Sequence, residues 1–154
     1  MAELALERRR SGAASLAVPA AWDVLVDVDP STPLVAVEPV RTTFRANVVV
    51  TRTTLAGLSF RDWQVGTDEL LARTLHSYRL LDLERLAVAG RAGGRRLAHH
   101  LTADGAALVL EQWCVVVDGA GWAVTSTVDV ERYDLLTDVS AAMAASFEIE
   151  GEGA

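Results

Sequence analysis

The sequence predicts an α+β domain built on one large antiparallel sheet flanked by two main helices, and two observations favour this class. Between Arg95 and Thr127, three β-rich runs are separated by the dipeptides Asp104-Gly105 and Asp118-Gly119. Asp-Gly supplies the positive φ angles that tight hairpin turns require. One helical pattern precedes these runs and another follows them. Strands joined by short turns pair antiparallel, so the order strands, helix, strands, helix indicates the α+β class.

The first half of the chain contains four short extended segments. Residues 1–14 carry clustered charges followed by Ser, Gly and Ala, and we expect a mobile tail there. The extended segments after it are residues 15–18, 24–28, 34–37 and 44–54. The last of them, FRANVVVTRTT, is rich in β-branched residues and is expected to be an interior strand.

Two amphipathic helices are expected. Ser59 is placed to cap the first, with Asp62 three residues later as in a capping box. Its apolar stripe would consist of Trp63, Leu70, Leu71 and Leu75. The second helix has Leu135, Leu136, Val139, Ala142, Met143 and Phe147 at helical spacing, with Asp134, Asp138 and Ser140 on its other side.

The remaining segments complete a single domain over residues 15–149. Residues 78–89 read as a strand, and GRAGG at 90–94 reads as a flexible connector before the three-stranded run. Residues 150–154 are acidic and contain glycine, and we expect them to be disordered.

A two-residue turn at Asp104-Gly105 would fix how the strands pair. It would place Leu101 opposite Leu108, His99 opposite Leu110, Leu97 opposite Gln112 and Arg95 opposite Cys114. The other face would then carry Arg96, His100, Glu111, Trp113 and, from the next strand, Trp122. We treat these five residues as the candidate binding cluster, on a sheet covered by a helix on each side.

Composition excludes several classes of function. The 154 residues have a net charge of −7, and all 14 basic residues are arginines scattered along the chain apart from Arg8–Arg10, so nucleic-acid binding is not expected. No apolar run reaches the roughly 18 residues of a membrane span. The single cysteine, Cys114, excludes an internal disulfide framework and any multi-cysteine zinc site. We therefore expect a cytoplasmic protein without a cofactor.

The chemically reactive residues favour structural roles. His99 and His100 are adjacent and point to opposite faces of a strand, so no metal site is expected. Cys114 reads as a small buried hydrophobic residue. Glu111 beside Arg96 and His100 is the only acid–base grouping, and an ordinary cross-strand ion pair is favoured over proton transfer. No catalytic residue is predicted. Trp113 and Trp122 either belong to the core or line a ligand slot or anchor a partner.

Several motifs together resemble a known family. They are Pro19-x-x-Trp22, RANVVVT at 45–51, SFRDW at 59–63, the hairpin GRRLAHHLTADGAALVLEQW at 94–113 and AMAASFEI at 142–149. This succession resembles the actinobacterial LpqN/DcrB-like branch of the PsbP-like superfamily. The resemblance implies an α/β/α sandwich around an antiparallel sheet, no catalysis, and docking on another protein.

The leading hypothesis is therefore a non-enzymatic protein-interaction module, an adaptor or specialised chaperone, including one that serves secretion. The first alternative is a protein that binds a small apolar ligand in a pocket between sheet and helix, near Trp113 and Trp122. A third is an enzyme that uses Glu111 and His100. An antiparallel sheet leaves edge strands, so a homodimer stays open, although no sequence feature identifies the edge.

Overall fold

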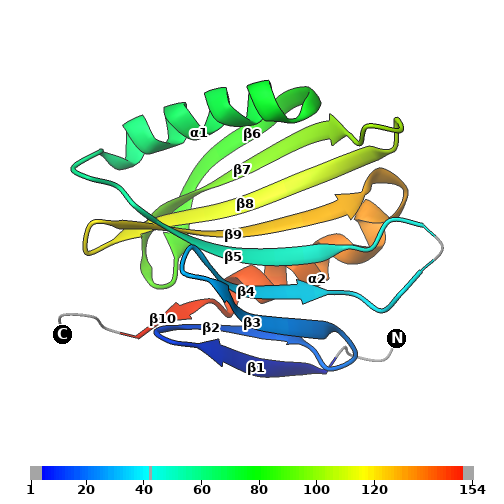
Figure 1. Cartoon of the computed structure of the whole chain (residues 1–154), viewed down its shortest axis with the longest axis horizontal. Coiled ribbons are helices and arrows are strands. Elements are labelled where there is room, and N and C mark those ends of the chain that lie inside the picture. Colours follow the sequence, from blue (N-terminus) through cyan, green and yellow to red (C-terminus); the bar gives the residue numbers. More distant parts are fainter. Residues whose placement is uncertain (1–4, 42, 151–154) are drawn as a thin grey trace.

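The computed structural model describes residues 5–41 and 43–150, which form two sheets and two α-helices (Figure 1). The larger sheet contains, in spatial order, β3 (Asp23–Asp29), β4 (Thr32–Val37), β5 (Asn47–Thr54), β9 (Ala120–Asp129), β8 (Ala107–Val117), β7 (Arg91–Leu101) and β6 (His76–Val88). The smaller contains β1 (Leu6–Ser11), β2 (Ala14–Pro19) and β10 (Glu148–Ile149). All the pairings are antiparallel, which confirms the predicted α+β class. No helix among the described residues is long and apolar enough to cross a membrane.

The two helices lie on opposite faces of the larger sheet. Helix α1 (Phe60–Thr74) covers one face, and α2 (Tyr133–Ala145), preceded by the short helix η1 (Val130–Arg132), lies on the other (Figure 1). The main core lies on the α2 side, where α2 and the smaller sheet pack against the larger one. Its most buried members, at 0 or 1% exposed, include Leu16, Val50, Val115, Val124 and Phe147. The sequence patterns did not predict the smaller sheet.

The expected mobile tail is wrong for residues 6–11, which form β1. This strand pairs with β2 across a turn at Gly12, whose φ of 56° suits glycine. Two of its three arginines have partners: Arg8 Nη1 donates to Ser15 Oγ at 2.8 Å, and Arg10 forms an ion pair with Glu150. Residues 1–4 and 151–154 lie outside the described residues. Glu150 donates its N–H to the Ala13 carbonyl at 2.7 Å, so the C-terminal segment lies against the β1–β2 hairpin. The composition of residues 6–11 suggested a mobile tail, but pairing with β2 makes them a strand.

The start of α1 is as predicted, but its packing is not. The Ser59 hydroxyl accepts a hydrogen bond from the Asp62 N–H at 3.1 Å, which confirms the N-cap. Trp63, Leu71 and Leu75 are half-buried, whereas Leu70, which the stripe placed with them, is 51% exposed. No residue of α1 is fully buried. The helix therefore rests on the sheet without inserting a side chain into a closed core.

The inner face of α2 differs from the predicted one by a rotation about the helix axis. Ser140, expected on the outer side, is 3% exposed and hydrogen-bonds to Ser126 with 2.8 Å between the hydroxyl oxygens. Leu135, expected inside, is 76% exposed. Two serines whose hydroxyls hydrogen-bond to each other can lie in a core. The polarity of Ser140 alone therefore predicted the wrong inner face for α2.

The two Asp-Gly turns differ in geometry. Asp118 and Gly119 both have positive φ and form the predicted two-residue turn. At the other turn only Gly105 has positive φ, and the N–H of Thr102 donates to the Ala106 carbonyl at 2.9 Å. This is a three-residue loop, so the predicted pairing of β7 with β8 is wrong by one residue.

The predicted connector GRAGG is also wrong, because its last four residues belong to β7. The turn lies one residue earlier, at Ala89-Gly90, where both residues have positive φ. The glycines within β7 allow close packing: a Cβ on Gly93 would lie 2.4 Å from the Cys114 carbonyl oxygen, and one on Gly94 would lie 3.1 Å from the Phe60 ring. These glycines serve contact between elements, not chain flexibility.

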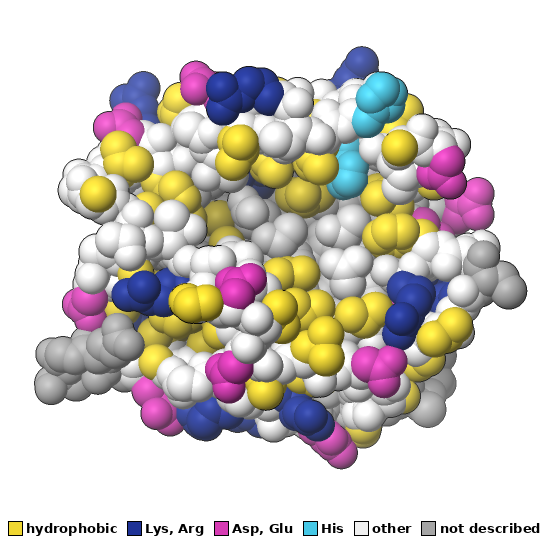
Figure 2. All heavy atoms as spheres, viewed as in Figure 1, with side chains coloured by type: hydrophobic (Ala, Val, Ile, Leu, Met, Phe, Trp, Pro, Cys, Tyr) yellow, Lys and Arg dark blue, Asp and Glu magenta, His cyan; other side chains and the backbone are white. Residues whose placement is uncertain are grey.

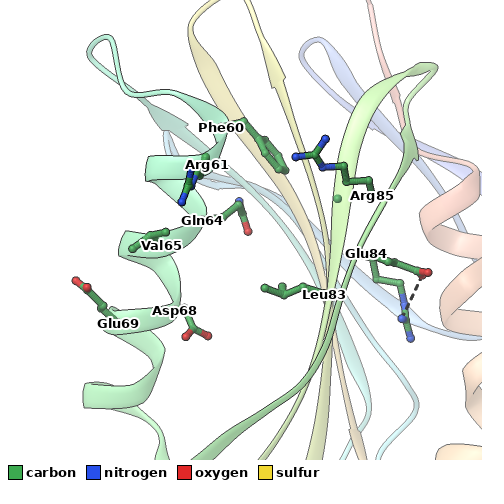
Figure 3. Close-up of a pocket in the computed structure, with 11 residues that line it drawn as sticks. Phe60, Arg61, Gln64, Val65, Asp68, Glu69, Leu83, Glu84 and Arg85 are labelled. Carbon is green, nitrogen blue, oxygen red and sulfur yellow. Dashed lines mark hydrogen bonds and ion pairs between the residues drawn. The ribbon is translucent and has the colours of Figure 1, made fainter.

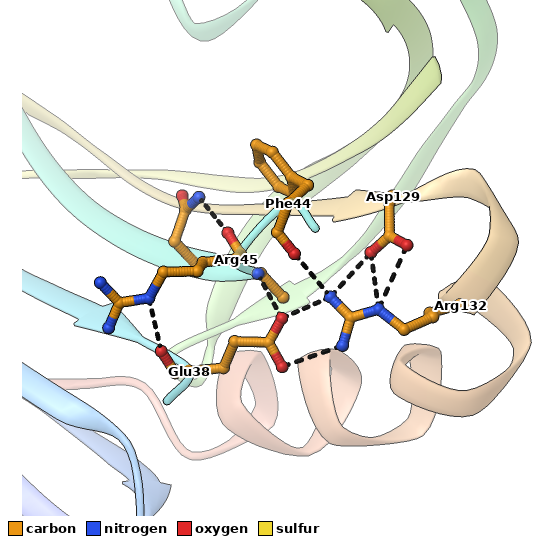
Figure 4. A network of polar contacts seen from close by, with 7 residues as sticks. Glu38, Phe44, Arg45, Asp129 and Arg132 are labelled. Atoms are coloured by element: carbon orange, nitrogen blue, oxygen red, sulfur yellow. Dashed lines mark hydrogen bonds and ion pairs between the residues drawn. The ribbon is translucent and has the colours of Figure 1, made fainter. Parts of the chain in front are cut away.

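A buried ion-pair network fixes the connection between β4 and β5 to the start of α2 (Figure 4). Arg132 pairs with both Glu38 and Asp129 and also donates to the Phe44 carbonyl at 2.9 Å. Glu38 also accepts the N–H of Ala46 at 2.7 Å. Burial of Glu38 raises its pKa, but the hydrogen bonds from Arg132 and Ala46 outweigh burial and lower that pKa below its ordinary value. Glu38 therefore stays ionised and acts as a structural clip.

Candidate functional site

The one-residue shift in pairing divides the predicted binding cluster between the two faces of the sheet. Arg96 lies opposite Gln112, and His100 lies opposite Leu108, so both are on the α1 face. Glu111, Trp113 and Trp122 are on the α2 face, where Glu111 lies opposite Leu97 and Ser126. The prediction that Trp113 and Trp122 share a face is confirmed, but the five-residue cluster is wrong because an odd-length loop reverses the side-chain direction of β7 relative to β8.

Glu111 pairs with a different arginine from the one expected. Its Oε2 lies 2.7 Å from Nη2 of Arg95, and its side chain is 6% exposed. Arg95 also lies 3.3 Å from Glu84 and 3.8 Å from Asp82. His100 is on the other side of the sheet, so the proposed acid–base pair of Glu111 and His100 does not exist. Glu111 therefore belongs to an ion-pair cluster along one edge of the α2 face.

Both predicted tryptophans are largely buried. Trp113 is 7% and Trp122 4% exposed, and the Trp122 ring centroid lies 6.2 Å from that of Phe147. The guanidinium of Arg52 lies 5.8 Å from the Trp122 ring centroid. Trp122 also borders a cavity of about 440 Å³ beside the β1–β2 turn, which Asp27, Asp29 and two prolines help to line. Trp113 lines neither this cavity nor the one described next.

The larger cavity, which we call the α1 cavity, lies between α1 and the edge strands β6 and β7 and has a volume of about 550 Å³. It is lined by Phe60, Arg61, Gln64, Val65, Asp68, Glu69, Leu83, Glu84, Arg85, Gly94 and Arg95. In Figure 3 the side chains of Phe60, Gln64 and Leu83 point into the space between helix and strand. The side chain of Arg85 extends from β6 toward Phe60. The cavity therefore combines an apolar centre with charged groups around it.

A polar layer lies beside this cavity, beneath α1. Arg96 is 1% exposed, and its guanidinium donates to Gln112 Oε1 at 2.7 Å and to the Gln64 carbonyl at 3.0 Å. Its Nε lies 3.7 Å from Asp68 Oδ1, which accepts a hydrogen bond from the Tyr78 hydroxyl at 2.7 Å. Burial and this hydrogen bond to Asp68 raise the pKa of Tyr78. A charged layer of this kind makes the α1 interface unlike the apolar core under α2.

Three buried nitrogen atoms near α1 have no hydrogen-bond partner among the described residues. They are Gln64 Nε2, Arg96 Nε and His100 Nδ1. Leaving a buried donor unpaired costs about 1–3 kcal/mol. In contrast, on the α2 side the buried hydroxyls of Ser126 and Ser140 hydrogen-bond to each other. The unpaired groups therefore concentrate on the face where α1 packs most loosely.

The histidine and cysteine on the α1 face are not activated for chemistry. Burial lowers the pKa of His100, which favours the neutral imidazole. Burial raises the pKa of the Cys114 thiol to about 11, so the protonated form dominates at neutral pH. Among the described residues, no three His, Cys, Asp or Glu side chains gather closely enough to hold a metal ion.

Large apolar side chains are exposed around the α1 cavity. Val65 of α1 is 51% exposed and Leu83 of β6 is 54% exposed, and both line the cavity. We call these two residues and the cavity the α1–β6 surface. β6 is the outermost strand of its sheet, and Leu81 is an extra residue in its pairing with β7. Figure 2, in the view of Figure 1, shows hydrophobic side chains gathered below α1 over the middle strands of the larger sheet.

Sequence reasoning missed this surface. No motif marks Phe60, Gln64 or Leu83, and the cavity depends on how far α1 stands from β6. One signal was present: Gln64, Thr67 and Asp68 fall between Phe60 and Leu71 on the inner side of α1. A polar group in the middle of a helix's inner stripe indicates a face that does not close onto a dry core.

The fold is shared with several solved structures at low sequence identity. LpqN of Mycobacterium tuberculosis, involved in cell envelope biogenesis, is 13% identical with a TM-score of 0.70, over 97% of this chain and 93% of that one. Cyanobacterial PsbP of Synechocystis is 13% identical with a TM-score of 0.69, over 96% and 94%. The Ran-binding protein Mog1p of Saccharomyces cerevisiae is 12% identical with a TM-score of 0.66, over 96% of each. No protein-family model matches the sequence, and no curated protein sequence matches it. The fold is therefore PsbP-like.

Proposed function

We propose that this chain is a non-enzymatic protein-interaction module, an adaptor or specialised chaperone, that binds a partner protein on the α1–β6 surface. The observation that carries the proposal is the α1 cavity, which Phe60 and two half-exposed apolar side chains, Val65 and Leu83, line beside an unpaired sheet edge. Single exposed apolar residues are normal on protein surfaces, but apolar residues that face each other across a cavity are typical of interaction sites.

The apolar group supplies free energy for association. Fully burying a Val or Leu side chain contributes about 1.5–3 kcal/mol, so Val65 and Leu83, each about half exposed, contribute roughly half of that each. β6 adds main-chain groups at an unpaired sheet edge, and its pairing with β7 is regular from Asp82 to Val88. An extended partner segment that pairs with this edge would lie directly beside the cavity.

The chemistry of the site also supports a binding role over a catalytic one. Glu111 and His100 lie on opposite faces, and the Cys114 thiol is protonated and 2% exposed. One protein of this fold, Mog1p, is a Ran-binding protein. We further assign the chain to the LpqN-like actinobacterial branch, which its likeness to LpqN and its lysine-free sequence favour.

The test compares capture of partners from the native organism by three forms of the protein. Val65→Asp combined with Leu83→Asp places charges on the α1–β6 surface, whereas Leu135→Asp changes an exposed leucine on α2, at the other face. We expect the protein captured by the wild type to be retained by Leu135→Asp and lost by the double variant. Equal retention by all three forms would exclude the α1–β6 surface as the docking site.

A second candidate function is binding of a small apolar ligand in the α1 cavity. Its volume of about 550 Å³ lies in the range of small-molecule sites, roughly 300–1,000 Å³. Native mass spectrometry of protein purified from its own organism checks this function. A retained small molecule that Leu83→Trp displaces would favour it, and a protein free of such a mass would oppose it.

A further inference from the structure

The charged groups around the α1 cavity are not equally engaged. Arg95 pairs with Glu111 and Glu84, and Asp68 accepts the Tyr78 hydroxyl and lies near Arg96. Neither Arg61 nor Arg85 has a hydrogen bond or ion pair to another described residue, and both are exposed. The internal pairs therefore leave two guanidinium groups available, one on each wall.

The one acidic lining residue that also lacks a described partner is Glu69. In Figure 3 its carboxylate lies on the side of α1 away from β6, whereas Gln64 and Phe60 point toward the strand. Arg61 and Arg85 carry positive charge and offer only hydrogen-bond donors, so the cavity is complementary to a ligand that accepts hydrogen bonds and carries negative charge.

We propose that the partner segment bound in the α1 cavity is both acidic and apolar. An aliphatic side chain fills the space beside Phe60 and Leu83, and neighbouring carboxylates bind Arg61 and Arg85. This inference rests on the proposed function and specifies the chemistry of the partner.

A peptide segment fits the surface better than a free carboxylate amphiphile. Leu83, Glu84 and Arg85 of β6 line the cavity, and β6 is the outermost strand of its sheet, so unpaired main-chain groups lie directly beside the cavity. A peptide that fills the cavity can also pair with this edge. A single alkyl chain within the cavity leaves these main-chain groups in water.

The binding test uses two fluorescein-labelled decapeptides, one of alternating leucine and aspartate and one of alternating leucine and lysine. Fluorescence anisotropy measures binding to the wild type and to the double variant Arg61→Glu, Arg85→Glu. The control double variant, Arg73→Glu with Arg79→Glu, changes exposed arginines of the same two elements that do not line the cavity. Circular dichroism checks folding, and the milder pair Arg61→Gln, Arg85→Gln replaces the charge reversals if they unfold the protein.

We expect the leucine–aspartate peptide to bind the wild type and to bind the cavity variant at least about tenfold more weakly, because two charge pairs become repulsive. The control variant should remain within about twofold, since isolated exposed charges contribute little. Equal binding of both peptides, or equal weakening by both double variants, would overturn the inference. So would binding of sodium laurate in the cavity by a protein that does not bind the leucine–aspartate peptide.

The outcome separates this inference from the proposed function. If Val65→Asp with Leu83→Asp abolishes capture of the natural partner while Arg61→Glu with Arg85→Glu does not, the docking surface stands and the acidic chemistry is wrong. If neither double variant affects capture, the docking surface itself is wrong.

Discussion

At the scale of single residues, Arg96 has the least usual environment in the molecule. It is 1% exposed, and its nearest carboxylate oxygen, on Asp68, is 3.7 Å from Nε and belongs to a side chain that is 38% exposed. Its two hydrogen bonds go to neutral groups, Gln112 and the Gln64 carbonyl. Arg96 therefore joins the sheet to the first half of α1 through polar contacts where most helices use apolar ones.

Truncation of Arg96 should destabilise the protein strongly. Arg96→Ala leaves Gln112 and the Gln64 carbonyl without their donor and opens a cavity, and we expect a loss of about 3 kcal/mol in the free energy of unfolding. Arg96→Met fills most of the space and should cost less than half as much. Urea unfolding measures both values, and an Arg96→Ala protein as stable as the wild type would refute the role of this residue.

His100 should make stability depend on pH. Burial lowers its pKa below the ordinary 6.5, so the unfolded chain binds this proton more readily than the folded one. The folded state therefore has its full stability above the ordinary pKa of 6.5. It loses stability as the pH falls from 6.5 toward the lower pKa of His100 in the folded protein. We expect the wild type to lose up to about 1.4 kcal/mol per pH unit in this window relative to His100→Gln. Parallel pH profiles of the two proteins in urea would contradict the prediction.

Individual functional residues were harder to predict than the elements that carry them. Trp113 and Trp122 share a face as the sequence indicated, because the Asp118-Gly119 turn has the expected two-residue form. Arg96 and His100 were assigned to the wrong face by one misjudged loop. A sequence of Ala-Asp-Gly-Ala suits both a two-residue and a three-residue loop, and the choice depends on the pairing of the whole strands, not on the turn alone.

At the scale of elements, α1 is held close to the sheet at Gly121 of β9. A Cβ at this position would lie 2.7 Å from the Trp63 ring, so only glycine allows the ring to rest on the strand. The cap at Ser59 was predictable because it is local, whereas this close approach joins residues far apart in the chain. The height of α1 above the sheet, and with it the α1 cavity, is thus set by contacts that leave no local pattern.

Substitution at Gly121 should therefore act through Trp63. Gly121→Ala alone should cost about 1–3 kcal/mol because the ring and α1 must move outward. In a Trp63→Leu background the same change should be neutral or stabilising, since alanine in a strand is favoured over glycine by about 0.5–1 kcal/mol. A double-mutant cycle in urea gives the coupling. The same cost in both backgrounds would show that the strand, not the helix, resists the added methyl group.

At the scale of the whole molecule, the two faces of the sheet have different roles. The α2 side holds the apolar core, including Phe147 and Met143, and the Glu38–Arg132 clip. The α1 side has a polar layer, unpaired nitrogens and a cavity. The order of elements and the antiparallel class were predictable from turns and periodicity. The difference between the two faces was not predictable, because it depends on which side of each helix packs against the sheet.

This asymmetry predicts that α1 opens before α2. α2 buries Ser140, Met143 and Ala144, whereas no residue of α1 is fully buried. Local opening requires less free energy where fewer apolar contacts are lost. Native-state hydrogen exchange should give α1 amides a lower opening free energy than α2 amides, by about 2 kcal/mol or more. Equal protection of the two helices would mean that α1 is fixed as firmly as the core.

The most direct measurement of the central claim is photo-cross-linking in the native organism, with a photoreactive amino acid placed at Val65 or at Leu135. Both positions are exposed and lie on helices on opposite faces of the larger sheet. If the α1–β6 surface is the docking site, the Val65 probe should yield one defined protein adduct that the Leu135 probe does not give. The same adduct from both positions, or an adduct from Leu135 alone, would contradict the claim.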